Sequence, residues 1–312
     1  MKVMNQSARL LIEKDPMKHI ERVARLCYKS EDKINDGHAK FCKRLFDNKH
    51  HAMLEHFRFI MEIAPPVYDV LSSVAHPYVE MTNSIFYGRQ RFVISFNARG
   101  LNNLTVDSMA EQFGVLPSVI DTIRNELIAH IIRYYGCYGL FGMDEDSHLE
   151  PLSFGVNFIE NDDDTMSELE RRRHRWFSVH MVTDRGISHE IVRHRMASFA
   201  QESTRYCNYG KTGEIAVIEQ GFNKGTHEYY IWLCNVENCE ISYNQLIESG
   251  ISPQYARSVL PTSVKTEIIM TAPVYEWDHF FDIRMFGNSG APHPLMKKLA
   301  SMVYDCIKEC II

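Results

Sequence analysis

The spacing of apolar residues switches repeatedly between the helix period and the strand period along this chain. After Asp15-Pro16, a favourable N-cap and first-turn pair, Ile20, Val23 and Ala24 follow at helical spacing. The same period predicts further helices at about residues 39–47, 118–135, 186–195, 226–249, 252–260, 275–285 and 293–308. Alternation of apolar and polar residues predicts strands at about residues 56–63, 91–97, 175–182, 214–219 and 264–271.

This mixture of helices and strands indicates the α+β class, and no internal repeat is evident in the pattern. One segment differs in character from its surroundings. Residues 65–172 contain a strand-like run, a long helical stretch and an acidic, loop-like region that ends in "ENDDDTMSELE".

Composition and charge narrow the class of protein. The chain has 312 residues, of which 45% are hydrophobic and 24% charged, and its net charge is −6. That composition is ordinary for a globular protein and does not favour wholesale binding of nucleic acid. No apolar run approaches the roughly 18 residues of a membrane span. The eight cysteines form no C-x-x-C pair and are expected to be reduced thiols, so we expect a cytoplasmic protein.

Two short motifs suggest familiar chemistry but fail on spacing. "HEIVRH" places His189 and His194 five residues apart, whereas a zinc-protease helix needs a spacing of four. "NYGKTG" lacks the upstream glycine of a phosphate-binding loop, because that position holds Arg205. The chain also has no G-x-G-x-x-G, so a dinucleotide would not lie in a Rossmann cradle. No metal site is expected.

The stretch "RHRMASFAQESTRY" at residues 193–206 is unusually rich in hydrogen-bond donors. Arginine recognises planar and phosphorylated groups through its fork of N–H donors. A single arginine of this kind is more often part of a structural ion pair. The stretch as a whole is too polar for a core and too regular for a random surface. From the residues alone, we interpret it as part of an enzyme that binds phosphorylated, planar ligands.

The same stretch carries a family resemblance. Arg193-His194-Arg195, followed after seven residues by Ser203, matches the R-H-R-x7-S signature of the flavin-dependent thymidylate synthases. "MLEHFRF", "ARSVLPTSVKTEIIMTA" and "EWDHFFDIR" resemble further segments of that family and occur in the same order. The resemblance covers about residues 16–62 and 173–305.

The resemblance implies a fold and an activity. The expected fold is the α+β fold of flavin-dependent thymidylate synthases with a large, mostly helical insertion, so that residues 1–64 and 173–312 form the catalytic domain and residues 65–172 the inserted segment. The family makes dTMP from dUMP, taking carbon from methylenetetrahydrofolate and electrons from NADPH through FAD. It works as a homotetramer whose active sites are shared between subunits, with no role for nucleic acid or membrane.

The resemblance also implies roles for individual residues. Arg284 would have the catalytic role of favouring the ionised form of uracil. The expected cofactor-binding residues are His56, Arg193, His194, Arg195, Gln201, His279 and His293. The expected substrate-binding residues are Glu190, Arg193, Gln201, Glu202, Ser203, Arg205, Arg257 and Arg284. Ser203 is expected to position the substrate, because no general base of the Ser-His type is evident beside it.

The chain departs from the family pattern at two places. Glu190 stands where the family usually has a glutamine that contacts the nucleotide, and an ionised carboxylate cannot donate a hydrogen bond. Pro273 and Tyr275 stand where the family has an N-x-R motif that contacts flavin. Asn97 and Arg99 supply an N-x-R in a similar strand-to-helix context, so we expect both to reach the flavin pocket. The alternative is that Asn97 caps a helix and Arg99 is a surface charge.

Two other classes of protein remain open at this point. One is a different flavin- or nucleotide-binding enzyme on the same scaffold. The other is a non-catalytic nucleotide-binding protein. A nucleic-acid-binding role for "RRRHR" at 171–175 is weaker, because aromatic residues are not interleaved with the basic ones.

Overall fold

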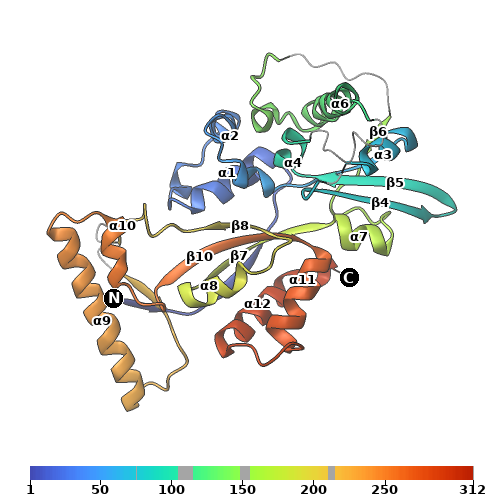
Figure 1. Cartoon of the computed structure of the whole chain (residues 1–312). Coiled ribbons are helices and arrows are strands. Elements are labelled where there is room, and N and C mark those ends of the chain that lie inside the picture. Colours follow the sequence, from blue (N-terminus) through green and yellow to red (C-terminus); the bar gives the residue numbers. More distant parts are fainter. Residues whose placement is uncertain (75, 105–114, 148–154, 210–214, 312) are drawn as a thin grey trace.

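A computed structural model describes residues 1–74, 76–104, 115–147, 155–209 and 215–311. Two four-stranded sheets meet in the middle of the molecule, and their main helices lie on opposite outer sides (Figure 1). Mixed helix and sheet confirms the α+β class predicted from the sequence. No described helix combines the length and the apolar character that crossing a membrane requires.

The first sheet has the order β4-β5-β3-β6, and its neighbouring strands are antiparallel. Its strands are β3 (Phe59–Ile63), β4 (Val79–Phe86), β5 (Arg89–Phe96) and β6 (Val156–Phe158). Its helices are α3 (Pro65–Ser72), α4 (Ala98–Asn102) and α6 (Pro117–Tyr135), and α1 (Pro16–Leu26) and α2 (His38–Asp47) pack against the same core. Because β3 pairs with both β5 and β6, the expected domain boundary between residues 64 and 65 falls inside one sheet.

The second sheet has the order β2-β7-β10-β8 and is also antiparallel. Its strands are β2 (Ser7–Leu11), β7 (Trp176–Asp184), β8 (Ser198–Gln201) and β10 (Lys265–Pro273). The helices that follow these strands are α8 (Arg185–Ile191), α11 (Val274–Phe281) and α12 (Pro294–Ile311), and α7 (Glu168–His174) precedes β7. A separate apolar core forms between β7, β10, α11 and α12.

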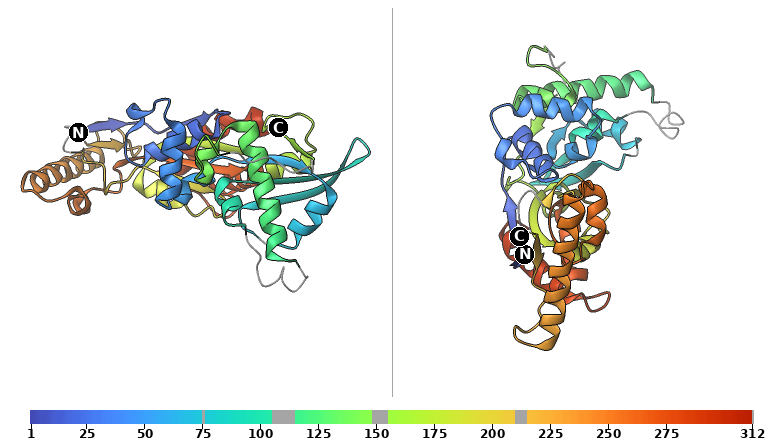
Figure 2. Two further views of the ribbon diagram at one scale, coloured as in Figure 1. Left: turned by 90° about the horizontal axis from the view of Figure 1, so that it is seen from above. Right: turned by 90° about the vertical axis from the view of Figure 1, so that its left-hand side faces the viewer.

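The remaining elements extend the molecule at one end. Strands β1 (Lys2–Met4) and β9 (Ala216–Ile218) form a small parallel pair. The long helix α9 (His227–Glu248) projects away from the body and is followed by α10 (Pro253–Ala256) (Figure 2). Short 3₁₀ turns lie at Glu31–Lys33, His51–Glu55, Tyr138–Phe141 and Arg257–Val259.

Most predicted elements are found, with local chemistry that explains their ends. The Asp15 carboxylate accepts hydrogen bonds from the backbone N–H groups of Met17 and Lys18 and so caps α1. Ser167 and Glu170 form a reciprocal capping box at the start of α7, within the stretch expected to be a loop.

Two helices end earlier than predicted. Both early ends lie next to expected site residues, Arg193–Arg195 in one case and Arg284 in the other. The helix expected over 186–195 ends at Ile191, so the R-H-R segment leaves the helix rather than continuing it. The helix expected over 275–285 becomes a π-helical turn at Asp282–Phe286, which carries Arg284. Such widened turns are frequently found at functional sites.

A cavity of about 420 Å³ lies where the two sheets meet. His19 and His56 line it and are buried, and burial lowers the pKa of His19 to about 4 and that of His56 to about 3. A chain of side chains links them, because His19 contacts Ser178 at 3.0 Å, Ser178 contacts Thr271 at 2.7 Å and Thr271 contacts His56 at 2.6 Å. Both histidines are therefore neutral members of a buried network.

Candidate functional site

The polar segment 193–206 is held at three points by neighbouring elements. Asp184 caps α8 by accepting a hydrogen bond of 2.7 Å from the Ile187 N–H, which fixes the helix from which the segment departs. The segment then enters the second sheet as β8, paired with β10. After β8, the Ser203 N–H donates to the carbonyl oxygen of Cys27 at 3.0 Å. Three polar clusters are anchored along this fixed segment.

The first cluster surrounds Arg284. Its Nη1 lies 2.7 Å from the Glu190 carboxylate, its Nη2 donates to the Glu190 carbonyl oxygen at 3.0 Å, and its Nε lies 3.4 Å from Nε2 of His194. The other nitrogen of His194 is 3.0 Å from the buried carboxylate of Glu276. Three groups thus orient the guanidinium, and the N–H bonds that they do not use remain for a ligand.

His194, Glu276 and His279 also place three possible metal-ligand atoms within 4.8 Å of one another. Arg284 lies against the same histidine and would repel a cation there. The arrangement suits a guanidinium better than a metal ion. His279 is exposed, and its ring lies 5.6 Å from that of His194, so it remains available to a ligand at this cluster.

The second cluster lies after β8 and faces an open pocket of about 650 Å³. Arg257 donates to the Thr204 hydroxyl at 3.2 Å, and Arg205 donates to the Gln254 side chain at 3.3 Å. Both arginines are exposed. Arg257 and Thr204 line the pocket together with Arg185 and His189. The pocket therefore offers guanidinium and hydroxyl groups suited to an anion.

The third cluster joins the polar segment to the first sheet. The Ser198 hydroxyl donates to Glu55 at 2.7 Å, and the other Glu55 oxygen accepts from Arg99. The Arg99 guanidinium lies 5.0 Å from the centre of the Tyr78 ring. Asn97 caps α4 by accepting from the Gly100 N–H at 2.7 Å, as the structural alternative expected. Arg99, in contrast, is a partly buried ion-pair partner rather than a free surface charge.

Arg193 and Arg195 are exposed, and neither side chain forms a hydrogen bond or an ion pair with a described residue. Ser203 is half-buried, and its hydroxyl accepts from the Arg205 N–H at 3.2 Å. The two flanking arginines of the R-H-R segment are thus the freest donors of the region.

Four expected site residues have structural partners instead. Gln201 donates to the hydroxyls of Ser188 and Thr266 at 2.8 and 3.2 Å. His56 is buried and bonded to Thr271, although it borders the internal cavity. His293 is exposed, and its ring accepts from the Leu295 N–H at the start of α12.

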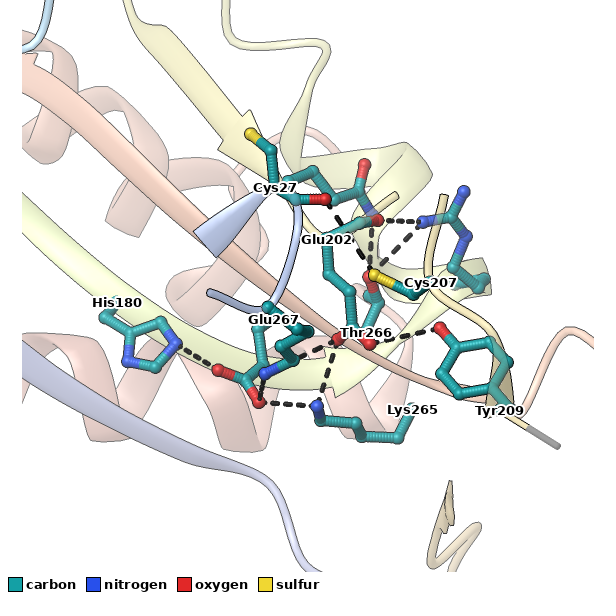
Figure 3. A network of polar contacts seen from close by, with 11 residues as sticks. Cys27, His180, Glu202, Cys207, Tyr209, Lys265, Thr266 and Glu267 are labelled. Atoms are coloured by element: carbon teal, nitrogen blue, oxygen red, sulfur yellow. Dashed lines mark hydrogen bonds and ion pairs between the residues drawn. The ribbon is translucent and has the colours of Figure 1, made fainter. Parts of the chain in front are cut away.

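Glu202 is the fourth of these residues and belongs to a buried charged network (Figure 3). It contacts Lys265 at 3.0 Å and accepts from the Tyr209 hydroxyl at 3.1 Å. Although burial opposes ionisation, hydrogen bonds from His180 and Lys265 hold the pKa of the adjacent Glu267 below its usual range. Carboxylates that are already paired in this way favour a structural role.

Several contributing residues were missed by the sequence analysis. Glu55 and Glu276 lie inside the family-like segments "MLEHFRF" and "EWDHFFDIR", but the sequence analysis gave roles only to other residues of these segments. Thr204 and Gln254 are ordinary polar residues that gain significance only when the fold brings them to the arginines. For the two carboxylates, the signal available in the sequence was their place next to or near an expected site histidine.

Comparison with known proteins bears on this geometry. Residues 167–310 match the family model described as thymidylate synthase complementing protein. Residues 167–310 resemble the flavin-dependent thymidylate synthases. The resemblance seen in the sequence is thereby confirmed for this part of the chain.

Individual relatives carry the same name. The flavin-dependent thymidylate synthase of Geobacter sulfurreducens is 33% identical over 100 residues, which is 32% of this chain and 43% of that protein. That of Pyrococcus horikoshii is 37% identical over 100 residues, 31% of this chain and 41% of that protein. The alignments thus span less than half the length of these relatives. A UMP/dUMP methylase from Streptomyces cacaoi, solved with 5-Br dUMP, aligns with 99% of this chain and 93% of its own at 12% identity and a TM-score of 0.41.

Proposed function

We propose that this chain is a flavin-dependent thymidylate synthase that methylates dUMP to dTMP, with methylenetetrahydrofolate as carbon donor and NADPH as reductant. The observation that carries the proposal is that Arg193, Arg195 and Arg205 lie on one sheet-anchored segment within the part of the chain that matches the family, and that Arg284 lies against His194 of the same segment. The guanidinium groups of Arg193, Arg195 and Arg205 are exposed and suited to phosphorylated ligands.

The nucleotide phosphate is assigned to the pocket beside α10. Arg257 and Thr204 line this pocket, Arg205 contacts its lining residue Gln254, and Ser203 directly precedes Thr204 in the chain. Ser203 positions the nucleotide in this scheme. Its hydroxyl already accepts from the Arg205 N–H, and no described base contacts it to make it a nucleophile.

Arg193 and Arg195 fit the diphosphate of FAD, because both are exposed and lack partners among the described residues. His279 and Arg99 are further candidates for the flavin, whereas His56, Asn97, Gln201 and His293 are better explained by the contacts they make in the fold. When bound, FAD would pass reducing equivalents from NADPH to the transferred carbon.

Arg284 would act on the uracil ring. A guanidinium against the ring's polar edge stabilises negative charge there and makes carbon 5 a better nucleophile. Glu190 and His194 hold the guanidinium in place beforehand, so little reorganisation is needed when the nucleotide arrives. Glu190 thus has a role different from that of the family glutamine: it orients Arg284 and does not donate to the nucleotide.

The family assembly would be a homotetramer with active sites between subunits, and this extends to the present chain as part of the proposal. The folate would bind beside the flavin. Neither requires nucleic acid or a membrane.

The visible spectrum of the purified protein tests the proposal. We expect a bound-flavin band that NADPH bleaches anaerobically, faster when dUMP is present, and dTMP as the product once methylenetetrahydrofolate is added. A flavin band without conversion of dUMP would favour another flavoenzyme on this scaffold. Binding of dUMP without flavin would favour a nucleotide-binding protein, and failure to bind flavin even when FAD is supplied would reject the synthase.

A further inference from the structure

The two sheets of the molecule share one connectivity. In the first sheet, β3 leads through α3 to β4, then to β5, and on to α4 and α6. In the second sheet, β7 leads through α8 to β8, then to β10, and on to α11 and α12. The strand orders β6-β3-β5-β4 and β2-β7-β10-β8 correspond position by position. The part of the chain up to α6 is called the first half, and the part from β6 onward the second half. Each half has its own apolar core.

The strand registers agree at the level of single residues. Glu62 pairs with Val93 in the first sheet, and His180 pairs with Ile269 in the second. We call β5 of the first sheet and β10 of the second the return strand. On its other side, Glu80 of β4 pairs with Ser95 in the first sheet, and Ser198 of β8 pairs with Thr271 in the second. Equivalent residues are 118 apart before the return strand (62 and 180, 80 and 198) and 176 apart from it onwards (93 and 269, 95 and 271). The second spacing also brings α6 (Pro117–Tyr135) onto α12 (Pro294–Ile311).

Residues that are equivalent at these spacings also make equivalent contacts between the two halves. His56 of the first half bonds to Thr271 of the second at 2.6 Å, and the equivalent His174 of the second half bonds to Ser95 of the first at 2.8 Å. Arg58 stacks on Trp176, its own equivalent, with the guanidinium 4.1 Å from the ring centre. Reciprocal contacts, with one position meeting its equivalent, are the mark of a two-fold interface.

A second reciprocal pair lies further from the centre. Glu55 of the first half accepts from Ser198 of the second, and the equivalent Arg173 of the second half donates to Glu80 of the first. The edge strands obey the rule as well. Strand β2, at the start of the first half, joins the second sheet, whereas β6, at the start of the second half, joins the first sheet.

We propose that the chain consists of two copies of one unit, within residues 7–135 and 156–311, that exchange edge strands and pack about an internal two-fold axis. Helices α1 and α2 belong to the first copy alone, and β9, α9 and α10 to the second. On this interpretation, residues 65–172 are no insertion, because most of them belong to the first copy. The interpretation rests on topology, register and reciprocal contacts, and does not depend on the proposed function.

The internal axis creates two equivalent junctions that differ in content. The first junction consists of Glu55, Arg99 and Ser198, and the second of Arg173, Tyr275 and Glu80. The polar segment 193–206 passes through the first junction at Ser198. At the second junction the segment of the first copy is poor in donors: Pro77 stands at the position equivalent to Arg195, and Ile85 at that equivalent to Ser203.

We infer that each chain forms one binding site, at the first junction, with residues from both copies, and that the second junction has only a structural role. This consequence rests on the proposed function for the identity of its ligand. At this single site, Arg99 comes from the first copy, whereas the residues that would bind the nucleotide come from the second.

Matched variants at the two junctions test the single site. Arg99→Gln and Arg173→Gln each break one Arg–Glu contact, at the first and the second junction respectively. Titration of the full chain with FAD, in the presence of dUMP, should give one FAD per chain. We expect Arg99→Gln to weaken FAD binding at least tenfold and Arg173→Gln to change it less than twofold. Two FAD per chain, or equal weakening by both variants, would overturn the single-site inference.

A second experiment addresses the two-copy interface without any ligand, so it stands if wild-type protein binds no FAD and the proposed function fails. Urea unfolding is measured for His56→Asn, Thr271→Val and their double variant, and for His174→Asn, Ser95→Ala and their double variant. We expect a single unfolding transition and a coupling of at least threefold in the unfolding equilibrium constant within each pair. Separate melting of the halves, or coupling in only one pair, would contradict a reciprocal interface.

Discussion

Replacement of Arg284 by lysine keeps the positive charge at the proposed uracil site but removes the planar guanidinium. Arginine contacts the Glu190 carboxylate at 2.7 Å, the Glu190 carbonyl oxygen at 3.0 Å and His194 at 3.4 Å. An ammonium group can keep the contact with the carboxylate but has no planar fork to hold the others. The cation therefore stays, while its orientation toward the uracil is lost.

The expected magnitude favours a catalytic effect over a structural one. Loss of a hydrogen bond at this partly exposed side chain should lower the free energy of unfolding by about 1 kcal/mol. Removing one preorganised donor from a site of developing negative charge costs about 2.7–4 kcal/mol, or roughly 10²–10³-fold in kcat. Turnover should thus fall far more than stability.

The assay measures dTMP formation and flavin content on the same preparation. Arg284→Lys should retain most of its flavin and lose roughly 10²–10³-fold in kcat. Glu190→Gln is the matched control, because its side-chain oxygen still accepts from Arg284, and we expect kcat to stay within about tenfold of wild type. Near-normal turnover of Arg284→Lys would refute the activation role, and parallel loss of flavin and activity would indicate a structural one.

Four other residues lead to further expected outcomes. Arg205→Ala should weaken dUMP binding by about tenfold or more, the value of a charge-assisted hydrogen bond, and FAD binding much less; equal losses in the two titrations would show that the phosphate is assigned wrongly. Ser203→Ala should keep measurable turnover, and complete loss of chemistry with intact dUMP binding would instead point to a nucleophile. Burial lowers the pKa of His56 to about 3, and burial together with nearby arginines does the same for His174, from an unfolded value of 6.5. Because the unfolded chain binds protons that the folded chain excludes, stability is complete above about pH 6.5 and should fall by about 1.4 kcal/mol per pH unit per histidine as the pH drops toward 4. Urea titrations at several pH values check this, and His56→Asn should flatten the slope.

The sequence predicted local elements well because their causes are local. The Asp15 cap and the alternation before Ile63 act over a few residues, and both are found in the structure. The end of α8 at Ile191 was not predicted, because "HEIVRHR" has helical spacing throughout and the chain turns away there to enter β8. Likewise, Gln201 and Glu202 resemble ligand-binding residues in sequence, but Thr266 and Lys265 of the neighbouring strand already satisfy them.

The internal correspondence was invisible in the sequence for two reasons. Few equivalent residues remain identical, and His56 with His174 and Phe59 with Phe177 are among them. The spacing between equivalent residues also changes from 118 to 176 at the return strand. The reason is that β9, α9 and α10 enter the second copy between β8 and β10, whereas β4 and β5 of the first copy are joined by a tight turn at Tyr87-Gly88. A search for a constant period therefore fails.

We infer that the departure from the family's N-x-R motif has its origin in the same correspondence. Asn97 and Pro273 are equivalent positions, and each is the N-cap of the helix after the return strand. Arg99 and Tyr275 are equivalent in the same way, two residues further on. The second copy has the R-H-R segment without the N-x-R motif, and the first has the N-x-R motif without the R-H-R segment. Within one internal pair of copies, each set of groups is needed only once, provided that both meet at one junction. At the first junction, Glu55 contacts both Ser198, on the segment that follows R-H-R, and Arg99 of the N-x-R motif, so the two motifs meet there.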